Sequence, residues 1–356
     1  MRLLDYIAQS RAPFLVERAS GVVCRLRSAC DFAGQIATCP LRYVLSDELA
    51  RTCAALAYTE NRQLIDCLDL VRLPAERLWV EWPDAARRDE LLRATPRITT
   101  DRPAVDVLRA GALIRASRSG RSGAMILFWT TRDRPNDPLV AALDTHFDLD
   151  GNLPESGNLY ALFDGALTGI RTGSGDCSHA IQSCVRYQFD RSWRQYYAQD
   201  ALSTEARDEV LRDSLATVAN DLPMVLALSL LFAARDGLSA TPSNLERLNA
   251  KRRRLGKRPL LEHVEISVAI SANEDVRIKP AAGAWRRAPR LHHVRGHVVR
   301  RANTIYWRAP HWRGHVRLGR VRTRTVSLQL APAQGRATTG DHGIIGTVAS
   351  TPAPAT

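Results

Sequence analysis

The sequence predicts an α+β protein with a helical N-terminal region, a central hairpin-containing sheet, a second helical segment and a basic C-terminal β-subdomain. Apolar residues recur at helical spacing over about the first 100 residues and again over residues 203–256. Between these regions, and after residue 257, short apolar runs bounded by turn-forming residues indicate strands. The 356 residues, of which 45% are apolar, suffice for two or three domains.

Shifts in pattern and composition predict five regions. They are a mainly helical region (1–100), a β-hairpin-containing sheet region with an irregular connection (101–202), a helical segment (203–256), a basic β-subdomain rich in His, Arg and Trp (257–331) and a disordered tail (332–356). The tail is assigned from its Gly, Thr, Ala and Pro content.

The N-terminal region begins with an expected short amphipathic helix between Met1 and Ala12. Helical spacing then predicts helices over Asp47–Tyr58 and Asn61–Leu68, with Ser46 as a plausible N-cap. A short charged helix is expected over Ala85–Arg93.

A strand is expected over Leu78–Trp82, before Pro83. Successive side chains of a strand point to opposite faces, so Trp79 and Glu81 share one face, and Val80 and Trp82 the other.

The central region carries a predicted hairpin. Apolar runs over Ala110–Ala116 and Ala124–Thr131 flank a Ser-, Gly- and Arg-rich segment, which predicts two strands joined by a flexible loop. A further strand is expected over His146–Leu149, and residues 151–180 are expected to form a long irregular connection.

Three helices are predicted in the second helical segment. One covers Thr204–Ala219, and a second, apolar on all sides and therefore buried, covers Met224–Arg235. Ser243 and Glu246 form an expected capping box for the third, which ends near Gly256. Its leucines at 245, 248 and 255 are expected to face the core, and its last turn is strongly basic.

The C-terminal region is expected to be β again. Strands are predicted over Val264–Ile270, over Leu291–Arg300 paired with Thr304–Trp307, and over Thr323–Leu330.

Positive charge is concentrated in the segment Lys251–Arg324. It holds 20 of the 50 basic residues and four acids, so it carries +16, whereas the remainder of the +13 chain carries −3. Six of the nine histidines and three of the seven tryptophans also lie there, and no acid occurs after Asp275 within the segment. A polyanion, most simply nucleic acid, is the expected partner.

Arginine accounts for 47 of the basic residues. Its guanidinium binds phosphate in a bidentate manner and stacks on bases, which favours nucleic acid. A GC-rich genome explains the same bias equally well, because arginine is also abundant in the near-neutral remainder.

Two stretches of the basic segment are the candidate contact surface. On one strand, His293, Arg295 and His297 would project from one face, and Trp307 to His315 would form a Trp/His/Arg loop. The predicted nucleic-acid-binding residues are Arg290, His293, Arg295, His297, Arg300, Arg301, Trp307, Arg308, Trp312 and Arg313. A locally packed β-subdomain without such a role is nearly as well supported.

Catalysis would require acids from outside this segment. Glu81, Asp148 and Asp150 are weak candidates, together with His293, His297 and His311, because a DxD pair at a strand end can hold Mg²⁺. Strand-end aspartates more often cap turns. No metal site or cofactor is expected: a four-histidine zinc site is disfavoured by the lack of cysteine past residue 184 and by the local positive charge.

The seven cysteines are irregularly spaced, and no CxxC pair or signal peptide is seen. We therefore expect a reduced, cytoplasmic compartment, and no membrane association, because the longest apolar run is too short to span a bilayer.

The strand Trp79–Trp82, the leucine-rich helix at 225–234, the run Leu248–Leu261 and the stretches Pro289–His297 and Trp307–Gly314 carry a resemblance. Over residues 225–330 above all, the chain resembles an uncharacterised family of bacteriophage and prophage proteins. That family has no assigned activity, so the resemblance implies a phage setting, in the host cytoplasm, and no catalytic residues.

Three functions follow from these observations. The leading one is a phage-type nucleic-acid-binding protein that uses the basic C-terminal surface. The second is a hydrolase or nuclease acting on nucleic acid or nucleotides through histidine acid–base chemistry. The third is a structural factor or one that docks on an acidic host protein.

Overall fold

The computed structural model describes residues 1–11, 13–17, 23–94, 106–151, 184–197, 203–218, 221–235, 237–268, 290–294, 296–302, 304–308, 311–313 and 315–320. The chain divides into two compact units. The first comprises Met1–Gly283 and His293–His311, and the second comprises Ala284–His292 and Trp312–Thr356. The predicted boundaries at residues 100, 202 and 256 therefore fall inside one unit, because strands from all of these regions join the same sheet. The expected tail lies outside the described residues.

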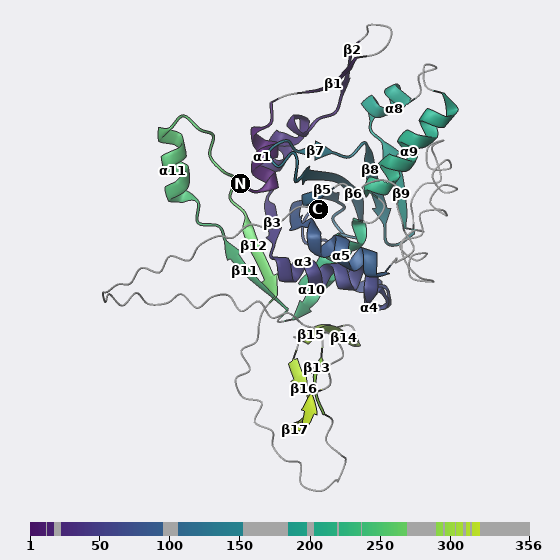
Figure 1. Cartoon of the computed structure of the whole chain (residues 1–356), viewed down its shortest axis with the longest axis vertical. Helices are drawn as coiled ribbons and strands as arrows, with labels where there is room; N and C mark the ends of the chain where they lie inside the picture. The colour runs from purple at the N-terminus through teal and green to yellow at the C-terminus, as the bar shows by residue number, and fades with distance from the viewer. Residues whose placement is uncertain are drawn as a thin grey trace, which may run out of the picture. The chain divides into compact units, whose positions relative to one another are not determined.

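A mixed sheet organises the first unit, and with the helices it confirms the α+β class (Figure 1). Its order is β11-β12-β3-β4-β5-β6-β8-β9, with β7 paired to β6. The strands are β3 (Leu41–Leu45), β4 (Arg77–Pro83), β5 (Val107–Ala116), β6 (Ser122–Thr131), β7 (Leu139–Val140), β8 (Leu143–Asp148), β9 (Val185–Phe189), β11 (Leu238–Pro242) and β12 (Val264–Val268). Strands β12, β3 and β4 run parallel, and the remaining pairs are antiparallel.

Helices cover both faces of this sheet. They are α1 (Leu3–Gln9), η1 (Ala29–Phe32), α2 (Ala33–Ala37), α3 (Asp47–Ala54), the π-helical turn η2 (Ala55–Thr59), α4 (Asn61–Asp66), η3 (Leu68–Leu70), α5 (Asp84–Ala94), α8 (Arg191–Tyr197), α9 (Thr204–Val218) and α10 (Leu222–Ala233). A further helix, α11 (Glu246–Arg254), stands away from the sheet. The predicted N-cap is confirmed, since the side chain of Ser46 accepts a hydrogen bond from the amide of Leu49.

The alternation along β4 separates two cores, as the sequence predicts. Trp79 packs into the smaller core with α1, η1 and α2, whereas Val80 and Trp82 belong to the larger core under α3, η2, α4 and α10. Residues Leu222 to Leu231 of α10 are buried, which confirms the predicted buried helix. Both sides of the central strands are thus shielded from water.

The predicted hairpin is confirmed as β5 and β6, but its loop is held rather than flexible. Gly120 adopts φ +69°, and a Cβ there would lie 2.6 Å from the carbonyl oxygen of Leu73. The amide of Leu73 donates to the carbonyl of Gly120, and the guanidinium of Arg121 donates to three carbonyls of residues 68–71. Local composition alone could not reveal these contacts, because the partner segment precedes the loop by about 50 residues.

A separate two-stranded hairpin follows α1. Strands β1 (Phe14–Glu17) and β2 (Val23–Leu26) pair antiparallel with each other and with no strand of the main sheet. Phe14 and Leu15 are 48% and 56% exposed.

The C-terminal strands form two small sheets. In the first, β10 (Ala234–Arg235), β15 (Thr304–Arg308) and β14 (His297–Arg301) lie in that order. In the second, the order is β16 (His311–Arg313), β13 (Arg290–Val294) and β17 (His315–Arg320). The pairing of residues 297–301 with 304–308 is as predicted, but the single strand expected over Leu291–Arg300 is wrong, because β13 and β14 belong to different sheets.

Candidate functional site

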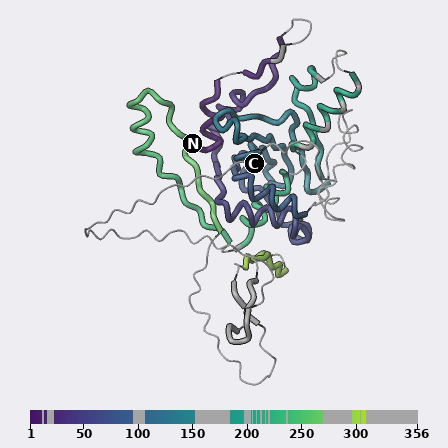
Figure 2. The backbone as a smooth tube through the Cα atoms, in the orientation of Figure 1, coloured from purple at the N-terminus to yellow at the C-terminus, as the bar shows by residue number. Residues whose placement is uncertain are grey.

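The best-defined basic surface is the end of α11. This helix lies in the connection between the neighbouring strands β11 and β12, and Figure 2 traces the chain leaving and returning beside them. Two hydrogen bonds join Ser243 and His263, where the chain leaves β11 and returns to β12. The amide of Ser243 donates to the carbonyl of His263, and the amide of His263 donates to the Ser243 hydroxyl. The predicted capping box is therefore wrong, since the Ser243 hydroxyl accepts a hydrogen bond from the amide of His263 and Leu245 occupies the N-cap.

Asn249 fixes the helix to the chain that follows it. Its buried side-chain amide donates to the carbonyl of Leu260 over 3.0 Å and accepts the amide of Leu260 over 2.7 Å. Arg252 donates a hydrogen bond to the side chain of Gln9, and Arg258 donates one to the carbonyl of Ala8. These bonds tether α11 and the segment after it to α1. The helix is thus held at several points although it leaves the sheet.

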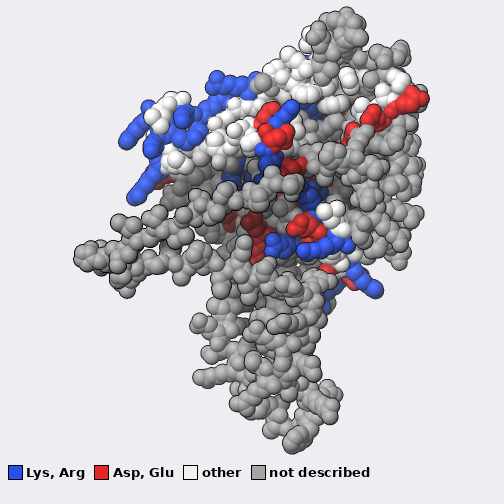
Figure 3. Space-filling view, viewed as in Figure 1, with Lys and Arg blue, Asp and Glu red and all other residues white. Residues whose placement is uncertain are grey.

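Seven basic residues crowd residues 247–258, against one acid, Glu246, in the first turn of the helix. Figure 3 shows Lys and Arg side chains gathered over α11. Arg252 and Arg258 serve as tethers. The other five, Arg247, Lys251, Arg253, Arg254 and Lys257, are exposed and form no ion pair within the described part of the chain. We call these five residues the α11 patch. Their like charges repel one another unless an anion neutralises them.

The predicted inward-facing leucines of α11 are wrong. Leu248 is 46% exposed and Leu255 61% exposed, and Leu245 is half-buried. Helical spacing of leucines normally predicts a core face, but this helix is held by polar bonds at its base instead.

The described C-terminal strands contribute two further free arginines. Arg301 on β14 and Arg308 on β15 are exposed and unpaired among the described residues. Arg300 is different: its guanidinium makes two bonds to Asp69, at 2.9 and 2.8 Å, and a third to the carbonyl of Asp66. The Asp69 carboxylate raises the pKa of Arg300 above its ordinary value. Arg300 therefore fastens β14 to the helical layer rather than presenting its charge.

The burial of Trp307 contradicts its predicted role as a stacking residue. It is 9% exposed and belongs to the larger core, because β15 pairs in parallel with β10. A Cβ on Gly237 would lie 3.1 Å from the Cβ of Trp307, so the backbone approaches this side chain closely. His297 on β14 is half-buried and already engaged in an interaction.

The other predicted contact residues are not tested by the structure. Arg295 lies outside the described residues, and for Arg290, His293, Trp312 and Arg313 only the strand positions are described, as for the catalytic candidate His311. The expected His-Arg-His face cannot form on one continuous strand, because His293 belongs to β13 and His297 to β14.

The acidic candidates for catalysis all have structural partners. Glu81 is fully buried and accepts the amides of Leu3 and Leu4, at 2.9 and 3.1 Å, together with the Nε of Arg109 at 2.5 Å. It therefore anchors α1 to the sheet. Period-two patterning places Glu81 on the right face of β4, but it cannot show that a helix start lies against it.

Asp148 and Asp150 form a turn at the end of β8. Asp148 Oδ1 accepts the amide of Asp150 over 2.9 Å, and Asp150 is paired with Arg121. The hydrogen bond from Arg121 lowers the pKa of Asp150. These contacts are those of aspartates that cap a turn, which was the alternative to Mg²⁺ binding for this pair.

Across the described ranges, no group of three or more His, Cys, Asp or Glu is placed to hold a metal ion. None of the described helices is long and apolar enough to cross a membrane. No family model, curated protein or solved structure matches this chain.

Proposed function

We propose that the protein binds nucleic acid through its basic C-terminal third, with the α11 patch as the principal contact. The observation that carries the proposal is the set of five exposed basic side chains of α11 and its C-terminal turn, which lack ion pairs among the described residues. Unlike Arg27 and Arg121, they are not held by carboxylates of the residues that the structure describes.

The dimensions of α11 suit a phosphate backbone. Nine helical residues span about 14 Å, and phosphates along one strand of a duplex recur about every 3.4 Å of axis. A helix of this length therefore lies beside about four phosphates of one strand. Arg301 and Arg308 on β14 and β15 are two further exposed basic side chains that the proposed contact can use.

A measurement of salt-dependent affinity tests the proposal. Fluorescence anisotropy with labelled single- and double-stranded DNA and RNA, at two or more salt concentrations, would compare the wild type with the triple variant Lys251→Gln, Arg253→Gln and Arg254→Gln. Glutamine preserves helix propensity. Loss of three phosphate contacts should reduce the slope of log K against log salt by about 2 for single strands and about 3 for duplexes.

The matched control removes three exposed arginines elsewhere on the first unit: Arg62→Gln, Arg77→Gln and Arg118→Gln. It changes the net charge equally and should leave the slope nearly unchanged. Absence of binding at low salt, binding without salt dependence, or equal losses in both triple variants would overturn the proposal.

An acidic protein surface is the second candidate, and Leu248 and Leu255 favour it. Exposed leucines among basic residues are typical of helices that dock on proteins, since apolar contacts add little to phosphate binding. The double variant Leu248→Gln and Leu255→Gln separates the candidates: nucleic-acid affinity should persist in it, whereas docking on a protein partner should weaken. A phage setting, implied by the resemblance, is an expectation of either candidate.

A further inference from the structure

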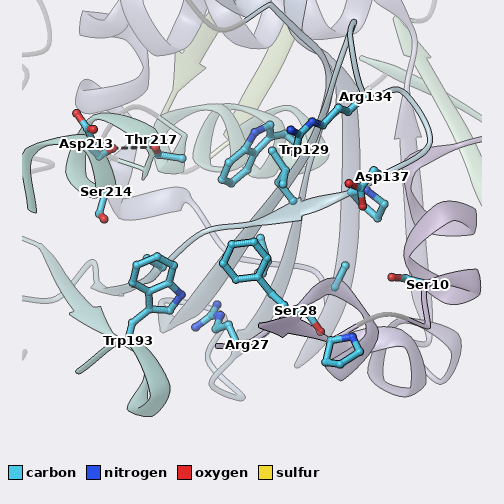
Figure 4. A pocket seen from close by; sticks show the side chains of 17 residues that line it. Ser10, Arg27, Ser28, Trp129, Arg134, Asp137, Trp193, Asp213, Ser214 and Thr217 are labelled. Atoms are coloured by element: carbon cyan, nitrogen blue, oxygen red, sulfur yellow. Dashed lines mark hydrogen bonds between the residues drawn. The ribbon is translucent and has the colours of Figure 1, made fainter. Parts of the chain in front are cut away.

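A cavity of about 440 Å³ lies in the first unit, beside the β1–β2 hairpin (Figure 4). Its walls come from β1, η1, the segment between β6 and β8, α8 and α9. The volume falls within the range of small-molecule sites. None of the residues that the nucleic-acid proposal uses lines this cavity.

Three aromatic side chains from three separate elements face this cavity. Trp129 comes from the end of β6, Trp193 from α8 and Phe14 from β1. Figure 4 shows the two indoles on different walls, with Arg27 near Trp193. Both tryptophans are only half-buried in the protein, and the ring of Trp193 also meets that of Tyr196 edge to face.

Arg27 lies at the wall of the cavity and is held there by two carboxylates. Its side chain is only 7% exposed, and its Nη1 donates to Asp144 over 2.6 Å. Its Nε lies 3.3 Å from a carboxylate oxygen of Asp190. The Nη2 is buried and has no hydrogen-bond partner among the described residues. The guanidinium also lies over the ring of Phe32, with its Cζ 5.2 Å from the ring centroid, so Arg27 is fixed by protein groups.

The surrounding charges disfavour an anionic ligand. Arg27 and Arg134 line the cavity together with Asp137 and Asp213, and these four charges cancel. Asp144 and Asp190, which hold Arg27, bring the local total to −2. A phosphate or a carboxylate is therefore disfavoured, whereas a neutral ring with an oxygen or nitrogen acceptor is accommodated.

We propose that this cavity binds a neutral, planar heteroaromatic ring with the chemistry of a nucleobase. The ring stacks on Trp129 or Trp193, and its polar edge faces the hydroxyls of the cavity wall. Ser214 lines the same cavity, as do Ser28 and Thr217, whose hydroxyls contact Cys30 Sγ and the carbonyl of Asp213 and can still accept a hydrogen bond.

Such a ring can come from a free nucleoside or from an unpaired base of a single strand. The contacts between α11 and this part of the fold favour the strand source. Arg252 of α11 bonds Gln9, and Gln9 and Ser10 line a second cavity that shares Ser10, Asp137 and Pro138 with the first. The strand case rests on the proposed function, whereas the nucleoside case does not.

Isothermal titration calorimetry with the full chain distinguishes these sources. The titrants are adenosine, guanosine, cytidine and uridine, and homopolymeric single-stranded oligonucleotides. Two variants act on the cavity: Trp193→Ala removes a stacking face, and Thr217→Trp fills the space. The control is Leu15→Ala, which alters an exposed residue of the same hairpin that does not line the cavity.

We expect at least one titrant to bind and both cavity variants to weaken it tenfold or more, with Leu15→Ala unchanged. Binding of a nucleoside supports the free-ligand source, and binding of an oligonucleotide alone supports the strand source. Absence of binding by every titrant, or binding that both cavity variants leave intact, would overturn the proposal. The triple α11 variant separates the two proposals, because it should weaken the oligonucleotide but leave nucleoside binding unchanged.

Discussion

Asp221, which precedes α10, and Arg87 of α5 meet inside the protein, where Asp221 Oδ1 lies 3.4 Å from Arg87 Nε. The same Nε donates to Asp84 Oδ1 over 2.6 Å, so one guanidinium serves two buried carboxylates. Burial raises the pKa of Asp221 to about 6; Arg87 lowers it and Asp84 raises it further. Burial also raises the pKa of the neighbouring Tyr58 hydroxyl.

This arrangement makes stability depend on pH. The pKa of Asp221 in the folded state exceeds its value of about 3.9 in the unfolded state. Protonation of Asp221 therefore stabilises the folded protein. This stabilisation is complete below about pH 4 and is lost as the pH rises through about 6. The free energy of unfolding should fall by an amount of the order of 2–3 kcal/mol. Urea unfolding from pH 4 to 7 should show this decline, and Asp221→Asn should flatten it. Asp66→Asn, at an exposed site, is the control. An identical pH profile for Asp221→Asn would contradict the assignment.

Replacement of Glu81 should destabilise the fold. Glu81→Ala leaves Arg109 without its partner and two amides of α1 without acceptors, and removal of one member of a buried ion pair costs about 3–5 kcal/mol. Chemical denaturation should register this loss, and hydrogen exchange should show α1 released from the sheet. Glu76→Ala, at an exposed carboxylate, should change stability by less than about 0.5 kcal/mol. Equal stability of the two variants would contradict an anchoring role for Glu81.

Trp307 should behave as a core residue. Trp307→Ala is expected to reduce the free energy of unfolding by about 3–5 kcal/mol, whereas Tyr306→Ala, on the exposed face of β15, should have a small effect. Trp307→Phe keeps most of the packing and should retain the wild-type affinity for nucleic acid. A folded Trp307→Phe protein that loses this affinity would instead support the stacking role predicted from the sequence.

Arg300 and Arg308 should differ in their effect on nucleic-acid binding. Arg300 is held by Asp69, so Arg300→Gln should leave the affinity and its salt dependence nearly unchanged. Arg308→Gln removes an exposed, unpaired charge and should reduce the slope of log K against log salt by about 0.7 for single strands. Anisotropy titrations of the two variants in parallel make the comparison. A larger loss with Arg300→Gln would show that the Asp69 pair opens on binding.

Much of the local structure could be predicted from short-range pattern. The Ser46 cap, the two-faced strand at Trp79–Trp82, the β5–β6 hairpin and the buried α10 depend on neighbouring residues, so their signals are complete in a few positions. The predictions for Ser243, Leu248 and Leu255 failed for the opposite reason. Ser243 is used by His263, 20 residues later, and the two leucines have no core to face.

The candidate site was only partly predictable. Density of basic residues indicates the α11 patch directly, but whether a given arginine is free depends on carboxylates distant in sequence, as Asp69 shows for Arg300 across 231 positions. The cavity beside the β1–β2 hairpin gave no sequence signal, since Phe14, Trp129 and Trp193 are scattered along the chain.

The amino-acid sequence by itself determined the α+β class, most element positions and the concentration of charge in the segment Lys251–Arg324, because propensity, periodicity and charge are local properties. Tertiary structure alone decided that Trp307 is buried, that Glu81 anchors α1, and that α11 stands away from the sheet with five basic side chains unpaired among the described residues. The physical reason is that burial and ion pairing depend on which distant segment packs against a residue, and strand pairing settles that.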